Sequence, residues 1–117
     1  MPVAGKSLYK TKAVTIDISE STTVSTAVDT DGLLLAGIIF PAAMTGTAIT
    51  FQVSNTNSNG TFKVLTETDG TDVSYTVSAD KQVRVDPSGW AGAGAIKIVS
   101  GSAEAADRVI KLVFHSA

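Results

Sequence analysis

The chain has 117 residues, no cysteine and a formal net charge of −2 at pH 7. This length makes one domain with a core of its own, and the lack of cysteine excludes disulfides and thiolate metal sites. The small negative charge disfavours nucleic acid as a partner, because proteins that bind a phosphate backbone normally present a basic surface. Residues 1–5 lack the apolar core of a secretory signal, and no apolar run approaches the roughly 20 residues that span a bilayer, so we expect no membrane partner.

Thr, Ser, Val, Ala and Gly are abundant, whereas Leu, Glu, Lys and Arg, which favour helices, are sparse. This composition is typical of a β protein. Only 17% of the residues are charged and the mean hydropathy is +0.24, so part of the surface consists of Thr, Ser and Ala. Such a surface fits a protein buried in an assembly, although a small Thr-rich monomer has the same composition.

Residues 1–12 show little periodicity and carry Lys6, Lys10 and Lys12 without an acidic residue. Two interpretations stay open. The segment is either a frayed terminus or an extended arm in which Tyr9 and the lysines contact a neighbouring subunit. Residues 13–117 form the single folded domain in either case.

Alternation of apolar and polar residues predicts short strands from Ala13 onward. The predicted strands are Ala13–Ser19, Thr22–Val28, Leu33–Phe40, Ala48–Ser54, Thr61–Thr68, Thr71–Ser78, Gln82–Asp86, Ala95–Ser100 and Arg108–Phe114. Residues 101–107 are ambiguous, because their Ala-Glu-Ala-Ala sequence also suits a helical turn.

The run Leu33–Phe40 is continuously apolar and lies between the turn signal Asp31-Gly32 and Pro41. Its length and its β-branched residues predict a central strand that is covered on both sides.

Asp69-Gly70 predicts a two-residue type I′ turn that pairs the flanking strands as a hairpin. Glu67, Asp69 and Asp72 gather at its tip, where carboxylates normally face water.

Residues 88–94 are expected to form a flexible loop that carries Trp90, the only tryptophan. Trp90 lies either at an interface or over the core, and stacking on a sugar is a lesser possibility.

Together these elements predict an all-β fold of eight or nine short strands in two packed antiparallel sheets, a β-sandwich or jelly roll.

The residues give little support to catalysis or to cofactor binding. The only histidine is His115, so a catalytic set would have to be built on the tail of the chain. Residues 29–32 (DTDG) resemble the start of a calcium loop, but Phe40 stands where the bidentate Glu is required. Residues 89–94 lack the Lys-Ser/Thr pair of a phosphate-binding loop. We therefore expect no enzyme activity, no cofactor and no metal.

Two stretches resemble small virion proteins of tailed bacteriophages, which are encoded among head and tail genes. They are LLLAGIIFPAAMTGTAITFQVSNTNSNGTFKVLTETDG, from Leu33, and VRVDPSGWAGAGAIKIVSGSAEAADRVIKLVF, which ends at Phe114. The resemblance covers about residues 24–114 and leaves the first 23 residues outside. It implies a β-sandwich decoration (cement) or fibre-base protein on the outside of a capsid.

From this resemblance we expect the major capsid protein as partner and a homo-oligomer, with a trimer favoured. The expected location is the capsid surface, after synthesis in the host bacterial cytoplasm. Low-charge surface and strand edges would be buried between subunits, and the candidate contact residues are Lys6, Tyr9, Lys10, Lys12 and Trp90. One alternative is a tail or fibre-base protein. Another, of a different class, is a carbohydrate-binding or adhesin module that uses Trp90 and the loop Asn55–Gly60.

Overall fold

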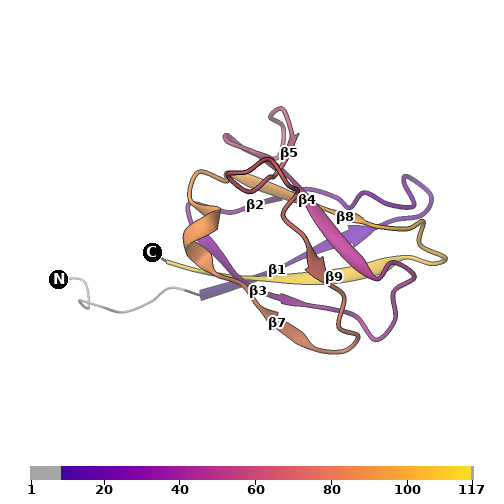
Figure 1. Cartoon of the computed structure of the whole chain (residues 1–117). Coiled ribbons are helices and arrows are strands. Elements are labelled where there is room, and N and C mark those ends of the chain that lie inside the picture. The colour runs from indigo at the N-terminus through magenta and orange to yellow at the C-terminus, as the bar shows by residue number, and fades with distance from the viewer. Residues whose placement is uncertain (1–8, 117) are drawn as a thin grey trace.

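The computed structural model describes residues 9–116, which form two antiparallel sheets packed against each other (Figure 1). The strands are β1 (Tyr9–Ile16), β2 (Val28–Asp29), β3 (Leu34–Ile39), β4 (Ala48–Ser54), β5 (Lys63–Val64), β6 (Tyr75–Thr76), β7 (Gln82–Arg84), β8 (Ala95–Ser100) and β9 (Arg108–His115). One short 3₁₀ helix, η1 (Pro87–Trp90), precedes β8. In the part of the chain described, no helix is long and apolar enough to cross a membrane.

The strand order is that of a jelly roll. Sheet A has the order β1-β9-β3-β7, and sheet B has the order β2-β8-β4-β5, with β6 also paired to β4. The chain therefore changes sheet at each step from β1 to β4 and again from β6 to β9. This alternation builds the double-sheet jelly roll. It confirms the predicted fold class and supplies the strand order, which the sequence did not predict.

The core lies between the sheets and consists of the residues that the alternation places inside. The members of the core cluster from β1, β4, β8 and β9 are Val14, Ile16, Ile49, Phe51, Ile96, Ile98, Ile110, Leu112 and Phe114. Each large apolar side chain buried in this way contributes about 1.5–3 kcal/mol relative to exposure to water. This burial confirms the predicted strands 48–54, 95–100 and 108–114 and the alternation on which they rest.

Strand β1 begins earlier than predicted. Its residues from Tyr9 onward pair with β9, starting with Tyr9 opposite His115, so the strand begins four residues before the predicted Ala13. Lys6 lies outside the described residues. At the other end, Ile18 is exposed instead of facing the core, because β1 ends at Ile16.

The segment after β1 is less regular than the predicted strand Thr22–Val28. Only Val28 of that range lies in a strand, the two-residue β2, while Val24 makes an isolated bridge to Val99.

Strand β3 is internal to sheet A, between β9 and β7, but it is covered on one face only. Leu35 and Ile38 are buried, whereas Leu34 and Ile39 are half-buried and belong to the outer face of the sheet. The expectation that this strand is covered on both sides is wrong. The apolar run alone did not distinguish a core face from a weakly covered outer face.

The turn at Asp69-Gly70 has a different form from the one predicted. The Glu67 N–H donates to the Thr71 carbonyl at 2.7 Å, and the Gly70 N–H donates to the Glu67 carbonyl at 3.0 Å. Three residues therefore form the loop, and Gly70, with φ of 89°, takes the left-handed position that closes it. The type I′ geometry occurs instead at Asp31-Gly32, with φ of 56° and 77°.

The strands that flank this hairpin do not form one long pair. Val64 in β5 lies opposite Gln52, and Tyr75 in β6 lies opposite Ile49, so both strands pair with the same edge of β4. Between them, only the bridge from Thr66 to Asp72 holds the hairpin together as a ladder. β5 and β6 thus form two parts of one edge strand, and the hairpin is the loop that interrupts it.

The ambiguous segment 101–107 is a loop held by the buried carboxylate of Glu104. Glu104 Oε1 accepts hydrogen bonds from Thr45 N at 2.7 Å and Arg108 Nε at 2.8 Å. Its Oε2 accepts from Gly46 N and from Ser100 Oγ, both at 2.7 Å. Burial alone would raise the pKa of Glu104, but these hydrogen bonds outweigh it and lower the pKa to about 2.

Candidate functional site

Trp90 ends the helix η1, and the local sequence sets its position. Asp86 Oδ1 accepts hydrogen bonds from Ser88 N at 3.1 Å and Ser88 Oγ at 3.0 Å, which caps the helix. Pro87 suits the first turn because its fixed φ is helical. Gly92, with φ of 91°, turns the chain after the helix. The segment that was expected to be a flexible loop is therefore an ordered, capped turn.

The indole of Trp90 is part of the core. It is 3% exposed, and its ring meets Phe51 edge-on, with 4.8 Å between centroids and an interplanar angle of 83°. Of the two main interpretations, the core position is the observed one. Trp90 was also a candidate contact residue, and this is corrected: its ring faces are taken up by the protein and offer no platform to a partner or a sugar.

One hollow beside Trp90 has a volume of about 460 Å³ and lies among residues 29–34, 55–57, 90 and 92–94. Hydrogen bonds tie its walls together. Thr30 Oγ1 donates to the Ala93 carbonyl at 2.9 Å, and Asp29 Oδ1 accepts from Ser58 N at 2.7 Å. The loop Asn55–Gly60 is thereby anchored beside Trp90, as the carbohydrate hypothesis requires, but no aromatic ring face is offered to a sugar.

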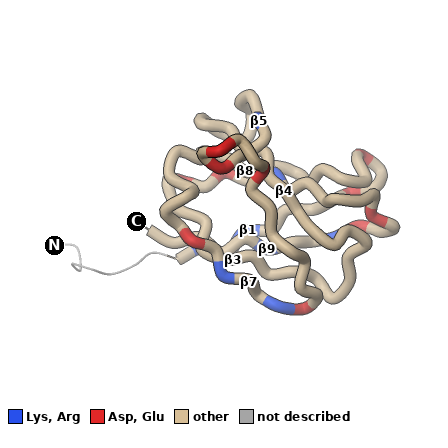
Figure 2. Tube along the Cα trace, viewed as in Figure 1, with Lys and Arg blue, Asp and Glu red and all other residues tan. Residues whose placement is uncertain are grey.

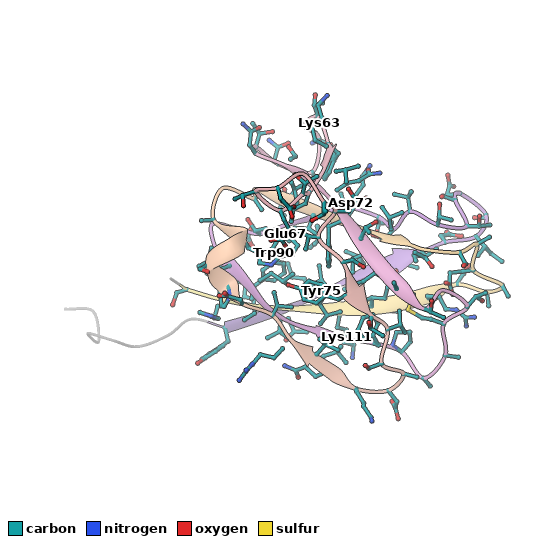
Figure 3. The ribbon with its side chains drawn as sticks, in the orientation of Figure 1. Lys63, Glu67, Asp72, Tyr75, Trp90 and Lys111 are labelled. Carbon is teal, nitrogen blue, oxygen red and sulfur yellow. The ribbon has the colours of Figure 1, made fainter. Side chains whose placement is uncertain are left out.

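A second hollow, of about 360 Å³, lies on the other side of Trp90 and is called here the Tyr75 hollow. Figure 3 shows Glu67, Tyr75 and Trp90 around it. Its lining residues are Leu65, Thr66, Glu67, Thr68, Val73, Tyr75, Asp86, Ser88, Gly89 and Trp90. The Tyr75 ring packs edge-on against Phe51, with 5.7 Å between centroids.

Burial raises the pKa of the Tyr75 hydroxyl, against the opposing effect of its hydrogen bond with Trp90. The negative charges of Glu67 and Asp86 raise this pKa further. The hollow offers hydroxyl and carboxylate acceptors to a polar ligand, and the described residues that line it include no histidine or lysine. No sequence signal predicts this hollow, because its lining residues come from two separate segments, 65–75 and 86–90.

The candidate contact residues at the start of β1 are engaged within the chain. Lys10 Nζ lies 3.2 Å and Lys12 Nζ 2.5 Å from the same oxygen, Oδ2 of Asp31. Hydrogen bonds from Lys12 and Lys10 lower the pKa of Asp31. Tyr9 is 69% exposed and its ring lies 6.2 Å from that of His115. That these residues also contact a partner remains a prediction.

His115, the only candidate base, hydrogen-bonds through its Nδ1 to the carbonyl of Ser116. Within residues 9–116, no group of three or more His, Asp or Glu side chains is placed to hold a metal ion. The Glu67, Asp69 and Asp72 side chains near the hairpin tip are exposed, and hydrogen bonds from Thr71 lower the pKa of Asp69.

The strand order and the two packed sheets define an antiparallel β-sandwich of jelly-roll topology. Neither a protein-family model nor a curated protein sequence matches the chain. The fold is similar to the crystal structure of the SPBc2 prophage-derived protein YomS, with a TM-score of 0.59. The two share 14% identical residues over 99% of this chain and 100% of that chain. At this identity the likeness shows a common fold along both chains.

Proposed function

We propose that this protein is a non-enzymatic structural component of a tailed bacteriophage particle. It decorates the outside of the capsid and stabilises contacts of the major capsid protein. The observation that carries the proposal is the similarity, along the whole of both chains, to a protein described as prophage-derived. The resemblance of residues 24–114 to small virion proteins supports the same class. Jelly rolls recur in viral capsid and lectin domains, but that is an analogy of fold and carries no function by itself.

The mechanism in this proposal is burial of weakly charged surface at positions that repeat across the shell. Only 17% of the residues are charged, so such burial leaves few charges without water or partner. Assembly as a homo-oligomer, with a trimer as the expected state, presents several copies of each contact and raises the apparent affinity.

The test uses purified protein and expanded, DNA-free shells of the major capsid protein from the same phage. We expect co-sedimentation that saturates at a fixed ratio to the capsid subunit, and a higher melting temperature of the shell. Absence of binding would contradict the decoration role. Mass spectrometry of separated heads and tails distinguishes it from a tail or fibre-base position.

A second candidate is glycan binding, because the Tyr75 hollow combines an aromatic side chain with the acceptors Glu67 and Asp86. A glycan array tests it, with Tyr75→Ala compared against the wild type. Binding that persists unchanged in Tyr75→Ala would exclude this hollow as the site.

A further inference from the structure

Sheet A differs in charge from the rest of the molecule. Its four strands contain five Lys or Arg residues and no Asp or Glu. The whole chain, in contrast, has 11 acidic and 9 basic residues. In Figure 2 the acidic positions lie outside these four strands, on loops and turns except for Asp29 in β2. The sheet is therefore cationic within an acidic protein.

The outer face of sheet A follows from its register. Lys12 lies opposite the buried Leu112, and Val14 lies opposite the buried Ile110, so these pairs face the core. The intervening residues face outward. On β1 and β9 they are Tyr9, Thr11, Ala13, Thr15, Val109, Lys111, Val113 and His115; β3 adds Leu34, Gly37 and Ile39, and β7 adds Gln82 and Arg84.

Most of this outer face is small or apolar, and its charges are unpaired. Val109 is 47% exposed. Arg84 and Lys111 are exposed and have no ion-pair partner among residues 9–116. The other three cations of the sheet are already bound to carboxylates of this chain, Asp31 and Glu104. The face thus combines apolar area with two cations that lack counter-charges.

We propose that the outer face of sheet A is the surface that docks onto the capsid subunit, and that its counterpart there is an apolar patch bordered by carboxylates. This inference rests on the proposed function. Charge complementarity argues for such a partner, since opposite charges across an interface steer association and fix its register. A second copy is disfavoured as occupant, because a two-fold contact through this face brings the cations of both copies together.

The size of the face fits one contact among many. The four strands have 8, 6, 3 and 8 residues. At about 3.3 Å per residue along a strand and about 4.8 Å between strands, these 25 residues cover roughly 400 Å². A standard interface buries about 800 Å² on each partner, so one such contact is weak. Repetition over the shell, or oligomerisation, supplies the remaining affinity.

Matched substitutions on the two sheets test the face. Lys111→Glu and Val109→Ser alter the outer face of sheet A. Lys63→Glu and Val64→Ser make the same changes on β5 of sheet B, where Lys63 is exposed and Val64 is 52% exposed. In Figure 3, Lys63 lies at the top of the view, on β5, and Lys111 lies lower, on β9 of sheet A. Thermal unfolding of all four variants identifies any change that acts through the fold.

The readout is co-sedimentation with the DNA-free shells described above. We expect Lys111→Glu and Val109→Ser to weaken binding about tenfold or more, Lys63→Glu and Val64→Ser to bind as the wild type does, and added salt to weaken wild-type binding. Reductive methylation followed by mass spectrometry gives a second readout on the unaltered chain. In the shell-bound protein, Lys111 should be protected and Lys63 should react.

The outcomes separate the two proposals. If the wild type binds shells and the sheet A variants bind equally well, the docking face is wrong and the decoration role stands. If the wild type does not bind shells at all, both are overturned. If the wild type self-associates in sedimentation velocity and Val109→Ser abolishes this, the occupant is a second copy and the inference is overturned.

Discussion

Arg108 Nε donates a 2.8 Å hydrogen bond to Oε1 of Glu104, four residues earlier, and the carboxylate that it reaches is buried. Through Thr45 and Ser100, the same carboxylate joins the loop before β4 to the end of β8. One side chain thus connects three segments at this end of the sandwich.

The first prediction concerns the pH dependence of stability. The folded pKa of Glu104, about 2, lies below its ordinary value of 4.5. The contribution of the ionised carboxylate to the free energy of unfolding is therefore complete above pH 4.5 and is lost as the pH falls toward 2. At neutral pH it amounts to about 3 kcal/mol. Glu104→Gln should lose about this much unfolding free energy at pH 7 and should flatten the acid limb, as measured by urea unfolding between pH 2 and 7.

The control for this prediction is Glu20→Gln, the same substitution at an exposed carboxylate. Between pH 2 and 7, the unfolding free energy of Glu20→Gln should vary with pH as that of the wild type does. Parallel acid limbs for wild type and Glu104→Gln would contradict the assigned role of the buried carboxylate.

The second prediction tests the space around the same carboxylate. A Cβ on Gly46 would collide with Ser100 Oγ and lie 3.2 Å from Glu104 Oε2. Gly46→Ala should therefore lower the unfolding free energy by about 1–3 kcal/mol. A Cβ on Gly89 meets nothing within 4 Å, so Gly89→Ala should stay within about 0.5 kcal/mol of the wild type. Equal melting temperatures for the two variants would show that the loop is not packed as described.

The third prediction tests the core position of Trp90. Trp90→Ala removes a buried indole that packs against Phe51, so it should cost about 3–5 kcal/mol in urea unfolding. Tyr9→Ala, at an exposed aromatic residue, serves as the control and should change stability by less than about 0.5 kcal/mol. Trp90 is the only tryptophan, so its fluorescence should shift to the red on unfolding. A red-shifted emission already in the folded protein would contradict burial.

The fourth prediction separates the backbone of the turn at Asp31 from its ion pairs. Asp31 has φ of 56°, a conformation that Asn tolerates and a β-branched residue does not. Asp31→Asn should therefore melt close to the wild type, since exposed ion pairs contribute little. Asp31→Val should melt distinctly lower. If both variants melt at the same reduced temperature, the ion pairs with Lys10 and Lys12 dominate instead.

The sequence predicted those parts of the fold in which neighbouring residues carry the signal. The alternation of β4, β8 and β9 located their inner faces. It missed the start of β1 because Lys10 and Lys12 occupy inward positions there, with their charged ends drawn out to Asp31. A rule that requires an apolar residue at every inward position does not recognise such lysines as part of a strand.

The other features that the sequence did not predict depend on contacts between distant segments. The local turn signal of Asp69-Gly70 predicts only a hairpin. Nothing in the sequence indicates that β5 and β6 pair with β4. Glu104 looks like any surface acid until the backbone of Thr45, 59 positions away, donates to it. The sequence left Trp90 open between an interface and the core, because nothing in a Gly-rich segment indicates that it packs on Phe51.

The interrupted edge of sheet B makes the molecule tolerant of inserted sequence. Because β5 and β6 each register independently with β4, residues between them can be added without shifting any pair in the sheet. Doubling the length of such a loop costs only about 0.6 kcal/mol in closure entropy. The hairpin projects from the side of the sandwich opposite sheet A (Figure 1). It is therefore the position at which a foreign peptide can be displayed without disturbing the fold.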